Sequence, residues 1–120
     1  MTKAKAHVVD RERAKMNDYE RAYVDEVLDP LLRARRIVRW DFQPCKLRLA
    51  DNSFYTPDFR VVNINHFVEF HEVKGWWRED ARLKIKYAAE AHPYVFLAIM
   101  VKKVAKKRGG GWTFSKPEVF

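Results

Sequence analysis

The sequence predicts an α/β sandwich in which a mixed central sheet of about four strands is flanked by helices, in the order helix, three strands, helix, strand. Two observations indicate this class. Apolar residues recur at helical spacing over residues 17–36 and 78–91, whereas alternating or continuous apolar runs mark the segments between and after them. Because 48% of the 120 residues are hydrophobic and no long linker interrupts them, a single domain over residues 1–120 is expected.

The first helix is expected to begin at Asn17, whose side chain can cap it, and to run to roughly residue 36. Pro30 either kinks this helix or restarts it behind Asp29. The preceding residues 1–15 are polar and basic, and they are expected to form a flexible arm or a frayed helical lead-in. The apolar stripe of the helix consists of Tyr23, Val24, Val27, Leu28 and Leu31.

Three strands are expected next, near residues 38–49, 54–62 and 67–74, because β-branched and aromatic residues alternate there between turn-forming segments. These strands are predicted to form an antiparallel meander. A second helix is expected over residues 78–91, where Pro93 stops it.

The continuous apolar run at residues 94–101 predicts a buried strand. Because a helix precedes this strand, the connection implies a crossover that lays it parallel to one of the earlier strands. The remaining residues 102–120 are expected to form a basic, glycine-rich tail.

Two carboxylates and one amine stand out because their spacing brings them together on the predicted sheet. Pro57-Asp58 lies near the start of the second predicted strand, and Glu72 and Lys74 lie at the end of the third. Side chains two residues apart point to the same face of a strand, so Glu72 and Lys74 share a face. In an antiparallel pair the start of one strand lies beside the end of the next, so Asp58 is expected to meet them at one edge of the sheet.

Two neighbouring carboxylates repel each other, so such a pair is usually explained by a bound cation. Ligands that are all oxygen favour Mg²⁺ or Mn²⁺ over zinc. Such an ion lowers the pKa of bound water and neutralises charge on a phosphate, as phosphodiester hydrolysis requires. Lys74 would then orient the water or stabilise the developing charge. The alternative interpretation is an ordinary exposed ion pair between strands.

Glu20 is an independent candidate on the first helix. At about 100° per residue, the four stripe residues that follow Tyr23 lie within about 80° of Glu20, so this acid lies on the axis of the apolar stripe. A carboxylate that faces the interior needs a partner, and a bound metal or a water in its shell would be one. Alternatively, Glu20 marks the edge of the stripe and reaches water or Arg39.

Pro57-Asp58 and Glu72-Val73-Lys74 resemble the two half-motifs of the PD-(D/E)xK nuclease superfamily. The likeness covers roughly residues 17–101. It implies a restriction-endonuclease-like sandwich and a Mg²⁺ cofactor for which Mn²⁺ can substitute. Further similarity, to the small phage-type endonuclease and resolvase-like branch, lies in the stretch from Asn17 to Tyr23, in Phe42-Gln43-Pro44, in Lys84-Ile85-Lys86 and in Pro93.

The resemblance also implies roles for individual residues. Asp58 and Glu72 would be metal ligands, and Lys74 would be the catalytic lysine. Glu20 would be the acid of the first helix, bound to the metal directly or through water, and the carbonyl of Val73 would be a further ligand. The residues implied in contacts with substrate phosphate are Lys84 and Lys86.

The excess of basic residues indicates a polyanionic partner. The chain has 24 Lys and Arg against 16 Asp and Glu, a formal charge of +8, and nucleic acid is the expected partner. A membrane surface is the rival, but no long apolar run occurs and the bases are not confined to one amphipathic helix. The lone Cys45 and the lack of an apolar N-terminal segment lead us to expect a cytoplasmic, intracellular protein, and the resemblance implies a phage gene expressed in a bacterial host.

Three further features lie outside the proposed motif. Trp76 and Trp77 either stack on unpaired bases or anchor the start of the following helix. His71 and Glu69 alternate to the face opposite Glu72, and we interpret them as structural or surface residues. A basic run before the glycines is either solvated or forms a mobile loop that grips phosphate. This run consists of Lys102, Lys103, Lys106, Lys107 and Arg108.

The sequence therefore predicts a Mg²⁺-dependent endonuclease that hydrolyses DNA phosphodiester bonds, with branched or nicked DNA as candidate substrates. The alternative is a non-catalytic module that binds nucleic acid or protein on a nuclease scaffold. A homodimer and a module of a larger phage or DNA-processing assembly both stay open.

Overall fold

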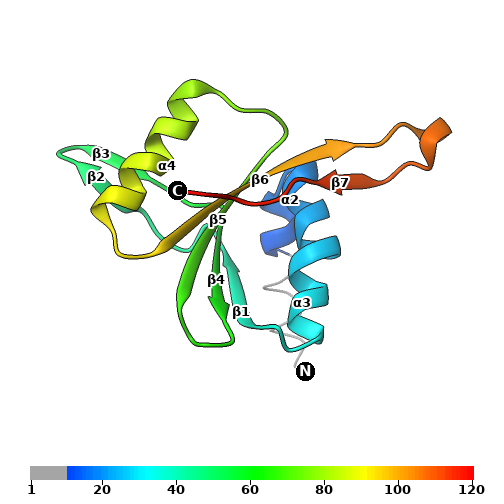
Figure 1. Ribbon diagram of the computed structural model, residues 1–120, viewed down its shortest axis with the longest axis horizontal. Helices are drawn as coiled ribbons and strands as arrows, with labels where there is room; N and C mark the ends of the chain where they lie inside the picture. Colours follow the sequence, from blue (N-terminus) through cyan, green and yellow to red (C-terminus); the bar gives the residue numbers. More distant parts are fainter. Residues whose placement is uncertain (1–10) are drawn as a thin grey trace.

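The computed structural model describes residues 11–120, and residues 1–10 of the expected arm lie outside this range. The chain forms a mixed α/β structure with a curled sheet, a helical segment along one side of it and a second helix on the other (Figure 1). Residues 11–15 are helical. For this part of the arm the helical lead-in is therefore the correct one of the two expectations.

The first helical segment begins at Asn17, as predicted. Its side chain accepts a hydrogen bond from the backbone N–H of Glu20, and the Glu20 carboxylate accepts one from the backbone N–H of Asn17. This reciprocal capping box satisfies two N–H groups that a helix start leaves free. The helix then runs through α2 (Asp18–Tyr23), the π-helical turn η1 (Val24–Leu28) and α3 (Asp29–Arg33).

The π-helical turn explains how the helix passes Pro30. Proline has no N–H to donate, so the regular hydrogen-bond ladder cannot continue through it. The N–H of Asp29 reaches back to the carbonyl of Val24, five residues earlier, and this wider turn absorbs the break. Pro30 then occupies the first turn of α3, where it is tolerated. A new α-helix therefore begins at Asp29 directly after the π-helical turn, in agreement with the expected restart at Pro30, and it ends at Arg33, a little before the predicted end.

The predicted meander and crossover are confirmed. Strands β1 (Ile37–Phe42), β4 (Phe59–Asn63) and β5 (Val68–Lys74) pair antiparallel in that order. The helix α4 (Glu79–Ala91) leads to β6 (Val95–Lys103), which pairs parallel with β5. Helix α4 has 13 residues, and no helix within residues 11–120 has the length and apolarity needed to cross a lipid bilayer.

Two predicted strands are each divided in two, which corrects the strand boundaries. Strands β2 (Leu47–Ala50) and β3 (Ser53–Tyr55) form a separate two-stranded hairpin that packs against α4. The division falls at Pro44 and at Pro57, and a proline cannot donate to a strand ladder. The result places Pro57 and Asp58 in the connection that enters β4.

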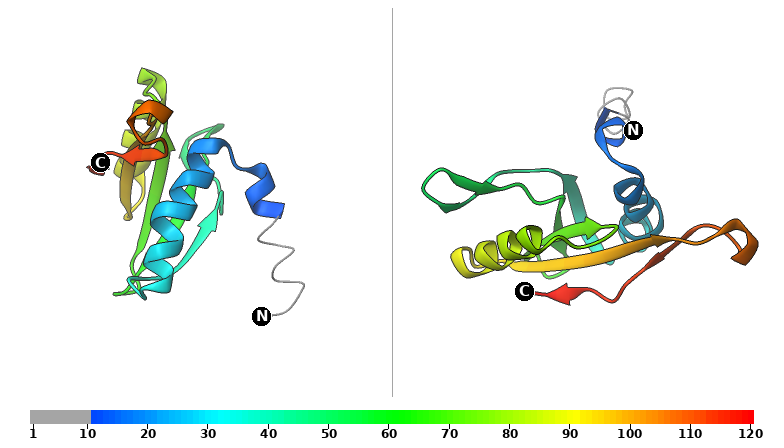
Figure 2. Two further views of the ribbon diagram at one scale, coloured as in Figure 1. Left: turned by 90° about the vertical axis from the view of Figure 1, so that its right-hand side faces the viewer. Right: turned by 90° about the horizontal axis from the view of Figure 1, so that it is seen from above.

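The segment 102–120, expected to form a basic, glycine-rich tail, also contributes three pieces of strand to the sheet. Strand β6 continues to Lys103, and β7 (Trp112–Phe114) pairs back onto it. Strand β8 (Glu118–Val119) also pairs with β6, which gives a six-stranded sheet in place of about four strands. The β6–β7 hairpin projects from the body of the molecule (Figures 1 and 2).

The hairpin carries the short 3₁₀ helix η2 (Lys106–Arg108) near its tip, followed by Gly109–Gly111. All three glycines have positive φ angles of 107°, 68° and 80°. Residues that carry a Cβ atom rarely adopt positive φ angles, so the backbone conformation of this turn favours three successive glycines.

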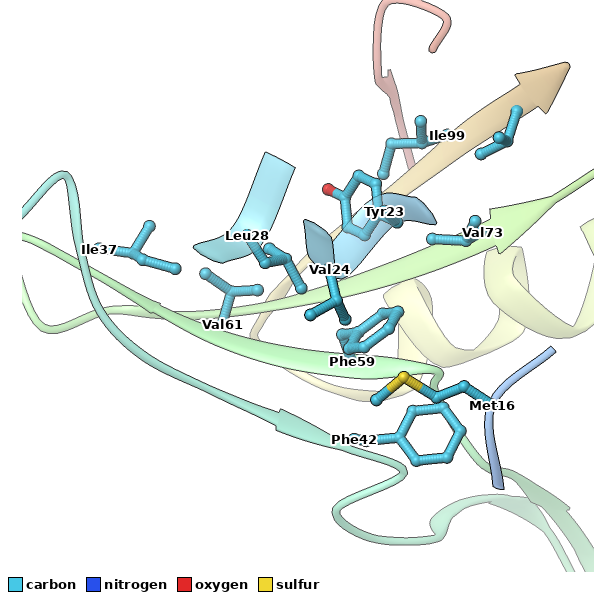
Figure 3. Close-up of a cluster of buried hydrophobic side chains, with 11 residues drawn as sticks. Met16, Tyr23, Val24, Leu28, Ile37, Phe42, Phe59, Val61, Val73 and Ile99 are labelled. Atoms are coloured by element: carbon cyan, nitrogen blue, oxygen red, sulfur yellow. The ribbon is translucent and has the colours of Figure 1, made fainter. Parts of the chain in front are cut away.

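Hydrophobic clusters fill both faces of the sheet. On one face Tyr23, Val24 and Leu28 pack on the sheet, with Phe59 fully buried among them (Figure 3). Burying a side chain of this size contributes about 1.5–3 kcal/mol. The cluster on the other face joins α4, the β2–β3 hairpin and the sheet, through Phe70, Ile85, Ala88, Phe96, Leu47 and Tyr55.

Candidate functional site

Asp58 and Glu72 meet at one edge of the sheet, where β4 begins and β5 ends. Phe59 of β4 is paired with His71 of β5, so the next residues outward, Asp58 and Glu72, face each other beyond the last pair. The backbone N–H of Asp58 donates to Glu72 Oε1 at 3.3 Å, and the N–H of Val73 donates to Asp58 Oδ2 at 2.9 Å. The predicted meeting of the two acids is confirmed.

Lys74 joins this pair from the same face of β5. Its Nζ lies 2.9 Å from Glu72 Oε2, and the hydroxyl of Tyr55 donates to Glu72 Oε1 at 2.7 Å. Asp58 and Glu72 are 7% and 5% exposed. Both carboxylates are therefore buried while Lys74 is partly exposed, so the contact is not an ordinary exposed ion pair between strands.

Burial and charge shift the proton affinities of this cluster. Burial, followed by the neighbouring Glu72 carboxylate, raises the pKa of Asp58 well above its usual value, although the hydrogen bond from Val73 opposes the shift. Burial lowers the pKa of Lys74, but the surrounding carboxylates, Glu72 foremost, outweigh it and raise that pKa overall. Lys74 therefore stays protonated, and Asp58 holds its proton to a higher pH than a free aspartate does.

Glu20 is buried, as its place on the helix stripe predicts, with 7% of its surface exposed. Its carboxylate is held by the N–H of Asn17 in the capping box, and Arg39 instead pairs with Asp41. The suggestion that Glu20 reaches Arg39 is therefore wrong. Glu20 lies close enough to raise the pKa of both Asp58 and Lys74, so it belongs to the same electrostatic cluster.

The donor atoms of this cluster suit a hard divalent cation. Its acids offer only carboxylate oxygens, and the pocket in front of Asp58 and Glu72 is lined by no His or Cys. Within residues 11–120, however, no three His, Cys, Asp or Glu side chains are already assembled as a metal centre. The Glu20 carboxylate accepts a hydrogen bond from the N–H of Asn17 at the start of its own helix, and Glu72 pairs with Lys74. A cation would have to compete with these contacts.

Two pockets flank Lys74, which lines both. The carboxylate pocket, of about 410 Å³, contains Asp58 and Glu72 on one side and Lys84 and Asp80 of α4 on the other. The second, which we call the Trp76 pocket, has a volume of about 260 Å³. It is lined by Asn17, Tyr19, Glu20, Val73, Lys74, Gly75, Trp76, Arg78 and Ala81.

The two tryptophans after β5 have different surroundings. Trp77 is partly buried against the α4 cluster, packs on Phe120 and receives the Arg82 guanidinium over its ring. Trp76 is 66% exposed at the Trp76 pocket. Trp77 therefore anchors the α4 start and the chain end, whereas Trp76 is free to contact a ligand.

The two lysines of α4 also separate. Lys84 lines the carboxylate pocket, whereas Lys86 is exposed and lies about 200° further around the helix. Lys86 therefore does not line the carboxylate pocket, and its contact with substrate phosphate stays a prediction. Lys84 makes no ion pair with any residue in the described range 11–120, so its charge is available there.

The basic run lies on the β6–β7 hairpin at the same end of the sheet as the acids. Strand β6 is parallel to β5 and continues past its partner Lys74 before the hairpin turns. Lys103 lies over the ring of Trp112, whose edge contacts Tyr19 beside the Trp76 pocket. Exposed cations without an acidic partner in the described part of the chain follow along this hairpin, namely Lys102, Lys103, Lys106, Lys107 and Arg108.

Sequence reasoning missed three residues that shape the site. These residues are Tyr55, Asp80 and Tyr19, none of which is singled out from the sequence. The alternation of Tyr55 with the rest of β3 could indicate a buried side chain, but not its contact with Glu72. Gly75 permits the position of Tyr19, since a Cβ atom there would lie 2.5 Å from the Tyr19 ring.

His71 and Glu69 are structural, as interpreted from the sequence. His71 Nδ1 lies 2.7 Å from the Tyr23 hydroxyl, and His71 Nε2 lies 2.9 Å from Glu69 Oε1. Asn63 donates to the other oxygen of Glu69. This chain of hydrogen bonds ties the first helix to β4 and β5 on the face opposite Glu72.

Comparisons with protein-family models, with curated proteins and with solved structures find no match to this chain. The function must therefore be inferred from the arrangement of the site itself.

Proposed function

We propose that this protein is a metal-dependent endonuclease of the PD-(D/E)xK kind that hydrolyses DNA. The mixed sheet would then be a version of the restriction-endonuclease-like sandwich. The observation that carries the proposal is the meeting of two buried carboxylates, Asp58 and Glu72, with the partly exposed Lys74 at one sheet edge. Burying two carboxylates for one ammonium group costs free energy, and active sites are where such costs are commonly found.

Asp58 and Glu72 would hold the cation, with Glu20 next to them. When bound, Mg²⁺ would supply charge neutralisation on the phosphate and acidify a water molecule. Lys74 keeps its proton because the acids raise its pKa, so it is suited to donate hydrogen bonds to a phosphate oxygen or to orient the water, and not to remove a proton. Tyr55 fixes the Glu72 carboxylate through its hydroxyl.

The surrounding cations support a polyanionic substrate. Lys84 stands at the carboxylate pocket without an ion-pair partner in the described part of the chain, and the β6–β7 hairpin extends the positive charge beyond the site. Lysines that neutralise phosphates release condensed counterions, which makes binding strong at low salt and weak at high salt. A DNA strand that follows the hairpin would bring its phosphates to Lys84 and Lys74.

Incubation of the protein with supercoiled, single-stranded and four-way-junction DNA tests the proposal, with Mg²⁺, with Mn²⁺ and with a chelator. We expect cleavage only with metal, and a fall of about 100-fold or more in Asp58→Asn and Lys74→Met. Asp51→Asn is the matched control, because Asp51 is an exposed acid on the β2–β3 turn. Equal cleavage by all variants would point to a contaminating nuclease and refute the assignment.

The second candidate is a module that binds nucleic acid on the same scaffold without catalysis. It is favoured by one observation, that two of the acids already have partners. The Glu72 carboxylate contacts Lys74 and Tyr55, and the Glu20 carboxylate accepts a hydrogen bond from the N–H of Asn17. Retained DNA binding with no metal-dependent cleavage of any of the three substrates would select this candidate.

A further inference from the structure

The Trp76 pocket is the feature that the nuclease proposal leaves without a role. It lies beside the carboxylate pocket, and Lys74 lines both. Its exposed wall is Trp76, and Tyr19 lies on the α2 side of it. Two aromatic rings beside a lysine at a proposed phosphate site form an environment suited to one nucleotide.

Trp76 is exposed although its neighbour is not. The residue has 66% of its surface accessible, whereas Trp77 is covered by Phe120 and Arg82. A tryptophan left accessible costs the hydrophobic free energy that burial would contribute. Its flat ring offers a stacking surface for any base, because every base has a π face.

Tyr19, which is partly exposed, forms the other side. Its ring lies against Gly75, where a Cβ atom would be 2.5 Å from it, and it packs nearly perpendicular to the ring of Trp112 on the basic hairpin. The pocket is thus connected through one aromatic contact to Lys103, which lies over the Trp112 ring. Strand phosphates on the hairpin and a base in the pocket could be bound at the same time.

The pocket also carries hydrogen-bond donors for a base edge. Asn17 uses its side-chain oxygen to cap α2, and its Nδ2 makes no hydrogen bond to any residue from 11 to 120. Arg78 adds a largely exposed guanidinium next to Trp76; its Nε lies 3.4 Å from Asp80 Oδ1, and its two terminal nitrogens are the donors offered to a base. Nucleobases present carbonyl and ring-nitrogen acceptors that such donors recognise.

We infer that the Trp76 pocket binds an unpaired nucleobase beside the phosphate held at Lys74, so that the protein selects single-stranded or frayed DNA over continuous duplex. The inference rests on the proposed function for the position of the phosphate. In a duplex the faces of a base are covered by its stacked neighbours, so a base can reach Trp76 only where it is unpaired or at an end.

Binding without catalysis tests this inference. Fluorescence anisotropy in the presence of a chelator would measure the affinity for a labelled oligothymidine, for a duplex of equal length and for an abasic strand. Trp76→Ala should weaken oligothymidine binding about 5- to 100-fold and change duplex and abasic binding less than about twofold. Trp76→Phe should recover most of the loss, since it keeps an aromatic face.

Tyr87→Ala is the matched control, because Tyr87 is an exposed aromatic residue on α4 outside both pockets that Lys74 lines. It should leave all three affinities unchanged. An oligouridine arm separates the two sources of an unpaired base, since equal Trp76 dependence would extend the pocket to RNA. Trp76 is exposed, so its variants should keep the thermal unfolding midpoint of the parent.

The outcomes separate the pocket from the nuclease. A Trp76-dependent preference for oligothymidine without any cleavage would uphold the pocket and refute catalysis. Metal-dependent cleavage with no effect of Trp76→Ala would refute the pocket and uphold catalysis. Equal weakening of single-stranded, duplex and abasic binding, or no binding of any oligonucleotide, would also overturn the inference.

Discussion

Asp58 and Glu72 lie against each other at the sheet edge, with the Asp58 N–H 3.3 Å from the Glu72 carboxylate, yet Lys74 pairs with Glu72 and not with Asp58. The Asp58 side chain instead accepts a hydrogen bond from the N–H of Val73. One of the two buried acids therefore has no cationic partner among residues 11–120. Because of this asymmetry, replacing Asp58 and replacing Lys74 should have opposite effects on the free energy of unfolding.

Replacing Asp58 by Asn should stabilise the metal-free protein. The amide oxygen of Asn can still accept from Val73, while the repulsion from Glu72 disappears. We expect a gain of about 0.5–2 kcal/mol in the free energy of unfolding, measured by thermal or denaturant unfolding in chelator. A clear loss of stability would mean that the Asp58 charge itself supports the fold.

The same variant should change the pH dependence of stability. Because the pKa of Asp58 is raised on folding, the folded protein binds more protons than the unfolded chain between the ordinary aspartate value and the raised one. Stability contributed by protonated Asp58 is thus present at low pH and lost as the pH rises through this window. The advantage of Asp58→Asn over the parent should grow as the pH rises above 3.8, the ordinary pKa of aspartate, and an advantage independent of pH would contradict the raised pKa.

The partners of Glu72 can be tested by a double-mutant cycle. Lys74→Met leaves the buried Glu72 carboxylate without its cation, and we expect a loss of about 1–2 kcal/mol, less than for a fully buried pair because Lys74 is partly exposed. Glu72→Gln in the same background should recover part of that loss. Additive effects of the two changes would show that the pair does not interact.

Tyr55 should contribute through a single hydrogen bond. Its hydroxyl donates to a charged acceptor, and such bonds contribute about 1.5–3 kcal/mol. Tyr55→Phe should lower the free energy of unfolding by roughly this amount, and Tyr87→Phe on the surface of α4 is the control. No loss would mean that water replaces the hydroxyl at Glu72.

Gly75→Ala should disturb the Trp76 pocket more than the rest of the fold. The added Cβ would lie 2.5 Å from the Tyr19 ring, so the ring must move away from the strand end. The clashing atoms are the outer end of the partly exposed Tyr19 side chain, so the ring can move with a loss of stability of about 0.5 kcal/mol or less. We expect weaker oligothymidine binding together with a modest loss of stability, and unchanged binding would show that Tyr19 has no part in the pocket.

The meeting of Asp58, Glu72 and Lys74 could be predicted because it depends on local geometry. Side chains two apart share a strand face, and the ends of antiparallel neighbours lie together. The prediction survived although the second strand was divided, since Asp58 still entered β4 at its start. Burial of Glu20 followed equally from helical periodicity.

The rest depended on contacts between distant segments. Trp76 and Trp77 are adjacent in sequence. Trp77 is covered by Phe120 and Arg82, which are distant from it along the chain or on another turn, so the sequence does not show which tryptophan is exposed. Strands β7 and β8 have three and two residues, too few for alternation to indicate them. The capping box did have a sequence signal, because Glu20 follows Asn17 by three residues. The place of Glu20 on the apolar stripe instead favoured an interior partner for its carboxylate.

The most direct test of a cation site formed by Asp58 and Glu72 is the unfolding temperature of the protein titrated with Mn²⁺. A ligand that binds only the folded state adds about 2.7 kcal/mol at 100 times its dissociation constant, so the parent protein should show a saturable rise in unfolding temperature. Asp58→Asn should start higher and show little further rise, whereas Asp51→Asn should behave like the parent. No Mn²⁺-dependent rise in the parent, or the same rise in Asp58→Asn, would contradict the proposed site.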